Sequence, residues 1–93
     1  MHEKHLTEDV VHKLEDLAKE QGGAHVTRIR VRLGALSHFT PEHFREHFEE
    51  AAAGTLAEGA DVQAELDTDP TAPGAQGVLL ETVELELERE DGQ

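Results

Sequence analysis

The sequence has 93 residues, enough for one small domain with a single core, and it is strongly acidic. Its 21 Asp and Glu against 8 Lys and Arg give a formal net charge of -13. That balance argues against a nucleic-acid binder and against association with anionic membranes. The apolar runs are too short to span a bilayer and the polar first residues predict no secretory signal, so we expect a cytoplasmic protein. Because the sequence contains no cysteine, any metal must be held by nitrogen or oxygen.

A first helix is predicted over residues 6–21, because apolar side chains recur there at helical spacing. Gly22 and Gly23 follow as a stop signal. The predicted buried stripe consists of Leu6, Val10, Val11, Leu14, Leu17 and Ala18.

A first strand is predicted over residues 25–33, where side chains alternate with a period of two until Gly34. Such alternation gives a strand one apolar and one polar face. We expect Thr27, Ile29, Val31 and Leu33 on the core face, and Val26, Arg28, Arg30 and Arg32 on the other face.

A second helix is predicted to begin at Pro41, with Thr40 as its N-cap, and to end at Gly54. Phe39 before the cap is expected to pack on Phe44 as a hydrophobic staple. The buried stripe of this helix is predicted to be Phe44, Phe48, Ala51 and Ala52.

Two further strands are predicted over residues 60–67 and 78–88, joined by a Pro- and Gly-rich surface loop over residues 68–77. Glu81 interrupts the apolar face that we predict for the last strand. The expected core faces are Val62, Ala64 and Leu66 in the second strand, and Leu79, Val83, Leu85 and Leu87 in the third.

These elements predict one α+β domain over residues 1–93, with two helices on one face of a small three-stranded mixed sheet in the order α-β-α-β-β. The outer face of the first strand is basic, whereas those of the second and third strands are acidic. Opposite charges on neighbouring strands stabilise a sheet, which favours the first strand at the centre. The alternative is that the arginines solubilise an edge strand. Homo-oligomerisation is left open.

The amino terminus is the main candidate metal site. A terminal amine followed by His2 can form fused chelate rings through the amine, a deprotonated backbone amide and the imidazole. Planar nitrogen ligation suits Ni(II) or Cu(II) better than zinc. The alternative is that His2 is an ordinary residue of a frayed terminus.

Other histidines give weaker metal candidates. A secondary divalent-ion site is predicted on the first helix, where two His and two Asp share one flank. The alternative for this flank is a solvated helix face. His43 and His47 lie one turn apart on the second helix, but Phe44 stands where a zinc-protease motif needs Glu. The flank of the first helix comprises His5, Asp9, His12 and Asp16.

An enzyme is not expected. Ser37 is the sole serine and no acid-base pair is identifiable around it. The glycines do not form a phosphate-binding loop. Carboxylates are too abundant for any pair of them to indicate catalysis.

Several motifs together resemble the hydrogenase nickel-incorporation protein family, HypA/HybF. They are the opening Met1-His2-Glu3, residues 31–37 (VRLGALS), residues 40–42 (TPE), residues 54–60 (GTLAEGA) and residues 80–86 (LETVELE). The resemblance covers nearly the whole chain. It implies a metallochaperone that hands nickel to the large subunit of nickel-iron hydrogenase, together with a GTPase partner.

The resemblance also implies the ligands of the nickel ion. They would be the N-terminal amine of Met1, the imidazole of His2, and the backbone amide nitrogens of His2 and Glu3. Glu3 would act mainly through its backbone. The metal would be Ni(II) as bound cargo.

One departure from the family pattern concerns zinc. The family carries a zinc ribbon with two Cys-x-x-Cys pairs between its second and last strands, whereas this sequence has the loop 68–77 there and no cysteine. We therefore expect no structural zinc. The alternative hypothesis is a metal-free protein-interaction module with the same fold.

Overall fold

The computed structural model describes residues 2–87, and side chains from His5 onward within that range. The elements follow in the order α1 (His2–Glu20), β1 (His25–Leu33), α2 (Pro41–Ala52), β2 (Asp61–Leu66) and β3 (Val78–Glu86). This order and the mixed three-stranded sheet confirm the α+β prediction. Glu88, the predicted end of the third strand, lies outside the described residues.

The sheet has β1 at its centre, in the order β2-β1-β3, as the charge pattern predicted. β1 pairs with β2 in parallel and with β3 in antiparallel orientation. Arg28 lies 3.4 Å from the Asp61 carboxylate on β2 and 3.8 Å from that of Glu84 on β3. The basic central strand is therefore paired with acidic strands on both sides.

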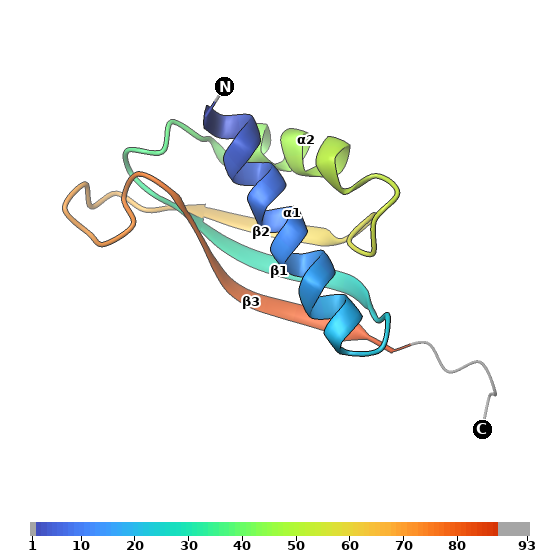
Figure 1. Ribbon diagram of the computed structural model, residues 1–93. Helices are drawn as coiled ribbons and strands as arrows, with labels where there is room; N and C mark the ends of the chain where they lie inside the picture. The colour runs from blue at the N-terminus through green and yellow to red at the C-terminus, as the bar shows by residue number, and fades with distance from the viewer. Residues whose placement is uncertain (1, 88–93) are drawn as a thin grey trace.

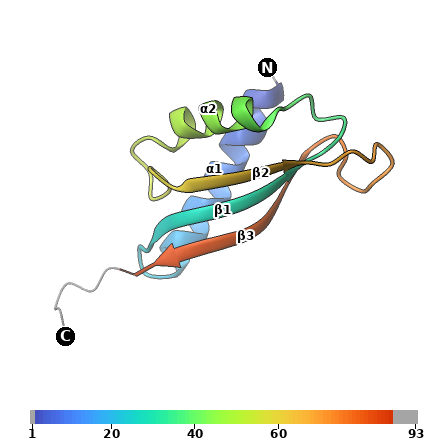
Figure 2. The same ribbon diagram turned by 180° about the vertical axis from the view of Figure 1, so that it is seen from behind.

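Both helices belong to the covered side of the sheet. Figure 1 shows α1 crossing in front of the strands, and Figure 2 shows the strands in front of α1 when the molecule is turned by 180°. Neither helix among residues 2–87 is long and apolar enough to cross a membrane. The buried core lies between the helices and the sheet and includes Val10, Val11, Leu14, Ala18, Ile29, Val31, Leu33, Phe44 and Phe48.

α1 ends where the sequence predicted, because two glycines adopt a left-handed backbone. Gly22 and Gly23 have φ of 83° and 85°, which cost little in residues without a Cβ. The N–H of Gly23 then donates to the carbonyl of Ala18 at 3.0 Å. This bond caps the helix and lets β1 start at His25.

A β-bulge at Thr27 corrects the predicted core face of β1. Val26 pairs with Leu85 and Arg28 with Glu84, so Thr27 has no partner residue on β3. An extra residue changes the phase of the side-chain alternation. Val26 is consequently buried, and the exposed Thr27 donates its hydroxyl hydrogen to the carbonyl of Glu84 at 3.1 Å. The prediction had these two side chains the other way round, with Thr27 on the core face and Val26 on the polar face.

A second irregularity, at Glu81, corrects the predicted core face of β3. Arg30 pairs with Thr82 and Val31 with Leu80, which leaves Glu81 as the extra residue. Leu80 therefore packs against the core, whereas Leu79 is 56% exposed. Leu87 is also exposed, contrary to its predicted place on the core face. Val83 and Leu85 pack against the core as predicted.

The start of α2 is built as the sequence predicted. The Thr40 hydroxyl accepts a hydrogen bond from the His43 N–H at 3.1 Å, and Pro41 occupies the first turn. Phe39 meets Phe44 edge to face, with 5.5 Å between the ring centroids. The cap and the staple together fix the direction in which α2 leaves the preceding loop.

Removing this cap gives a first testable expectation. We expect Thr40→Ala to lower the free energy of unfolding by about 1 kcal/mol, because the His43 N–H loses its acceptor. Urea unfolding followed by circular dichroism measures the change. Thr40→Ser keeps the hydroxyl and is the control. Equal stability of the alanine and serine variants would contradict the capping role.

Candidate metal centre

The candidate nickel ligands lie at the start of α1. The helix begins at His2 rather than at residue 6, so the backbone of His2 and Glu3 belongs to its first turn. The first four N–H groups of a helix have no acceptor within the helix, which leaves these two amide nitrogens outside the helical hydrogen-bond ladder. Met1 and the side chains of His2 and Glu3 lie outside the described part of the structure, so the ligand set stays a prediction.

The first turn of α1 lies beside the start of α2 in both views (Figures 1 and 2). A hollow of about 260 Å³ between these helices is lined by Glu8, His47, Glu50 and Ala51. His47 is half-buried, and its ring lies 6.4 Å from that of Phe39. An imidazole and two carboxylates therefore lie near the end of the molecule that carries His2.

The two histidines of α2 lie in different environments. His43 is exposed, whereas His47 faces the hollow beside α1. Among the side chains of residues 5–87, no group of three or more His, Asp or Glu is placed to hold a metal ion. The pair therefore has no third ligand from this part of the chain.

The flank of α1 that we predicted as a secondary metal site lies on the exposed side of the helix. His5, Asp9, His12 and Asp16 are all exposed, but they belong to no metal-binding group of three within residues 5–87. Positions that share a helix flank span several turns, so their side chains need not converge. The secondary metal site and its alternative, a solvated helix face, therefore both stay predictions.

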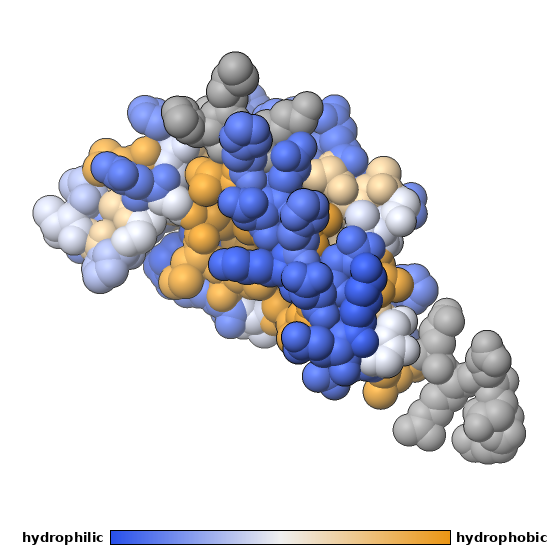
Figure 3. Space-filling model, in the orientation of Figure 1, coloured by the Kyte–Doolittle hydropathy of each residue, from blue (hydrophilic) through white to orange (hydrophobic). Residues whose placement is uncertain are grey.

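An apolar groove runs beside the same part of α1. Its volume is about 400 Å³, and Asp9 and Lys13 lie at its rim. Figure 3 shows the hydrophilic outer side of α1 with hydrophobic surface next to it. The groove is lined on its apolar side by Leu6, Val10, Val78, Leu79 and Leu80.

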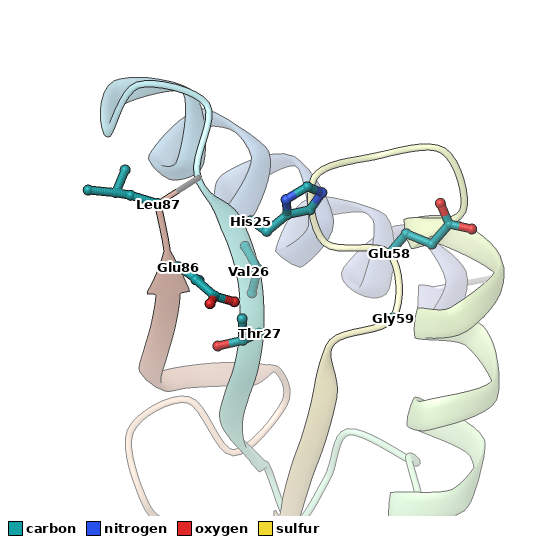
Figure 4. A pocket seen from close by; sticks show the side chains of 7 residues that line it. All are labelled: His25, Val26, Thr27, Glu58, Gly59, Glu86 and Leu87. Carbon is teal, nitrogen blue, oxygen red and sulfur yellow. The ribbon is translucent and has the colours of Figure 1, made fainter. Parts of the chain in front are cut away.

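His25 lies at the other end of the molecule, where α1 finishes and β1 begins. It lines an open pocket of about 580 Å³ with Glu58 and Glu86. Figure 4 shows His25 projecting toward the loop that carries Glu58, with Glu86 on the β3 side. The sequence indicated a turn residue here, because a pocket formed by three distant segments leaves no local signal.

The turn before α2 holds His38 in an unusual conformation. Its φ is 67°, in the left-handed region that few residues other than glycine adopt. The buried Ser37 hydroxyl stabilises this turn by donating to the carbonyl of Gly34 at 2.8 Å and accepting from the Phe39 N–H at 3.3 Å. Ser37 therefore has a structural role, and the side chain of His38 is exposed.

The loop after β2 is attached to the end of β1 by main-chain hydrogen bonds. The N–H of Asp67 donates to Leu33 at 2.8 Å, and the N–H of Gly34 donates to Gly77 at 2.9 Å. Within the loop, hydrogen bonds from the hydroxyl and N–H of Thr71 lower the pKa of the Asp69 carboxyl. The loop over residues 68–77 is thus held to the end of β1 by hydrogen bonds and is shaped by further hydrogen bonds of its own.

Comparison with known proteins places the chain in a family. Residues 1–71 match the family described as hydrogenase/urease nickel incorporation, metallochaperone, HypA. The hydrogenase maturation factor HypA of Methylocella silvestris is 48% identical over 60 residues, which cover 64% of this chain and 53% of that protein. HypA of Acidithiobacillus ferrooxidans is 40% identical over 63 residues, covering 68% and 56%. HypA of Chlorobium limicola is 35% identical over 65 residues, covering 70% and 56%.

The chain belongs to the HypA family of nickel-incorporation proteins. It spans about half the length of the curated relatives that it matches. The matched region contains the Met1-His2-Glu3 opening, both helices, β1 and β2. The family resemblance found in the sequence is therefore confirmed over residues 1–71, and the motif at residues 80–86 lies outside the matched region.

Proposed function

We propose that this chain is a cytoplasmic nickel-binding metallochaperone, and not an enzyme, that supports maturation of a nickel enzyme. The family match over residues 1–71 carries this proposal, because it includes the opening Met1-His2-Glu3. The client is nickel-iron hydrogenase, and a maturation GTPase takes part in the delivery. The domain acts without a thiolate zinc site, since its 93 residues contain no cysteine.

The proposed ligands are the amine of Met1, the imidazole of His2, and the amide nitrogens of His2 and Glu3. Consecutive backbone and side-chain nitrogens form fused five- and six-membered chelate rings around one metal ion. Four nitrogen donors in a plane suit Ni(II). The start of α1 at His2 supports this arrangement, because the first amides of a helix have no partner within it.

Nickel titration of the untagged protein tests the proposal. We expect one Ni(II) per chain with the absorption spectrum of a square-planar complex. His2→Ala and an N-terminally acetylated form should each bind at least roughly 100-fold more weakly, because each loses a nitrogen ligand. His12→Ala is the matched control, since it removes an exposed histidine from the same helix and should bind normally.

The same titration should depend on pH in a defined direction. Protons compete with nickel for the amine and for the imidazole, so affinity should fall as the pH drops below about 6.5, near the ordinary pKa of histidine. Equal nickel binding by the wild type, His2→Ala and the acetylated form would rule out the terminal site.

A further inference from the structure

One face of the sheet carries no helix, and its charges are arranged around Arg30. We call this surface the open face; Figure 2 shows its side of the sheet. Residues paired across neighbouring strands point to the same side, so the register defines its members. They are Arg28, Arg30 and Arg32 on β1, Asp61, Gln63 and Glu65 on β2, and Leu79, Thr82 and Glu84 on β3.

The two outer arginines of the open face are paired within the chain. Arg28 lies between the carboxylates of Asp61 and Glu84. Arg32 donates from Nε to Glu81 at 3.0 Å and lies 4.0 Å from Glu65. The hydrogen bond to Glu81 raises the pKa of Arg32. Both guanidinium groups therefore have their charge balanced locally.

Arg30 differs from both of these neighbours. Its cross-strand partners are Gln63 on one side and Thr82 on the other, and both are neutral. The side chain of Arg30 is exposed, and within residues 5–87 its guanidinium takes part in no ion pair or hydrogen bond. Within the described part of the chain, the open face thus presents one unpaired cation, Arg30, at its centre. The carboxylates around it outnumber the two arginines that they contact.

We propose that the open face is the docking surface for a partner protein that places one carboxylate on Arg30 and basic side chains around it. Arginine is enriched among the residues that dominate binding energy at interfaces, and its planar fork binds a carboxylate through two hydrogen bonds. Leu79, 56% exposed and opposite Arg32, lies at the border between the open face and the groove beside α1. The proposal rests on the proposed function, in which the partner is a maturation protein.

The charges favour this occupant over two others. A second copy of the chain would bring another -13 charges against the same carboxylates. A nucleic acid would bring phosphates, which those carboxylates also repel. A basic protein surface with a single acidic residue complements both the surrounding carboxylates and the central Arg30. The negative charge of the whole chain also attracts such a basic surface toward the open face.

Charge reversal at Arg30 tests the docking surface. The probes are the hydrogenase-maturation GTPase and the nickel-iron hydrogenase large subunit encoded in the same genome, titrated with wild-type chain. We expect Arg30→Gln to weaken binding of at least one probe roughly 10-fold, and Arg30→Glu roughly 100-fold. Lys13→Glu is the matched control, because it changes the net charge equally on the helical side and should alter binding less than about 3-fold.

The outcomes separate the docking surface from the proposed function. Thermal unfolding of Arg30→Gln should stay near wild type, since the Arg30 guanidinium has no partner within residues 5–87 to lose, and this variant separates loss of docking from loss of the fold. Nickel titration should also be unchanged, because Arg30 is not a ligand. If Arg30→Glu binds both probes as tightly as wild type does, or if wild type binds neither, the docking proposal is overturned. Absence of nickel binding by wild type would instead contradict the proposed function.

Discussion

Gly34→Ala is expected to detach the loop that follows β2 from the end of β1. A Cβ at this position would lie 2.1 Å from the carbonyl oxygen and 2.4 Å from the carbonyl carbon of Ala75, and 2.6 Å from the oxygen of Gly74. All three are backbone atoms, so no side chain can rotate away. The loop must move, which breaks the bonds from Gly34 to Gly77 at 2.9 Å and from Leu36 to Ala75 at 2.7 Å.

The expected cost is about 2–4 kcal/mol, from overpacking and from two lost main-chain hydrogen bonds. Urea unfolding measures the free energy, and hydrogen exchange of the Gly34 and Leu36 amides reports the detachment directly. Gly77→Ala is the matched control: its Cβ would lie 4.0 Å from the nearest atom, the oxygen of Gly74, and its stability should stay within about 0.5 kcal/mol. If the two variants behave alike, the close contact at Gly34 does not hold the loop.

Phe44→Ala is expected to have the largest effect on stability. The ring is fully buried, lies edge to face with Phe39 at 5.5 Å, and stacks on Phe48 at 6.1 Å between centroids. These three are all the aromatic Phe, Trp and Tyr residues in the sequence, and they meet in one cluster. Truncating a buried phenylalanine costs about 3–5 kcal/mol, a large part of the stability of a domain this size.

Thermal unfolding measures this loss. The midpoint should fall by roughly 4–8 °C for each kcal/mol in a domain of this length. His43→Ala changes the preceding, exposed position of α2 and should shift stability by less than about 0.5 kcal/mol. A loss below about 1 kcal/mol for Phe44→Ala would show that the aromatic cluster is not the centre of the core.

The sequence predicted the order of the elements because each carries a local signal. The start of α2 is indicated by Thr40 and Pro41, and the end of α1 by Gly22 and Gly23. The alternation of side chains over most of β1 indicates a strand. The strand order could also be predicted, since charges on the polar face depend on the neighbouring strand.

The two bulges could not be predicted in the same way. A strict two-residue alternation assigned Thr27 and Leu79 to the core, whereas the register with the partner strand excludes both. A bulge is a property of a strand pair and becomes visible only when both strands are aligned. The core faces of β1 and β3 were therefore each wrong over part of their length.

Some features of the candidate site could also be predicted from the sequence, whereas others depend on the fold. The motif at residues 1–3 can be seen in the sequence because its chelate needs only consecutive residues. The flank from His5 to Asp16 stays a prediction, because helical spacing gives these residues a shared side of α1 but does not by itself bring their side chains together. The free charge of Arg30 depends on Gln63 and Thr82, which are far apart in sequence, so it emerged only from the register.

The two hydrogen bonds that hold the ends of the loop after β2 have a consequence for the tolerance of this loop to changes in length. Asp67 is fixed to Leu33 at 2.8 Å and Gly77 to Gly34 at 2.9 Å, so both ends of the loop are anchored to the same short stretch of chain. The length of chain between these anchors does not enter the pairing of β2 or β3, and the entropy of closing a loop grows slowly with its length. This junction is therefore a natural insertion point, at which the chain can be lengthened or shortened while β1, β2 and β3 keep their register.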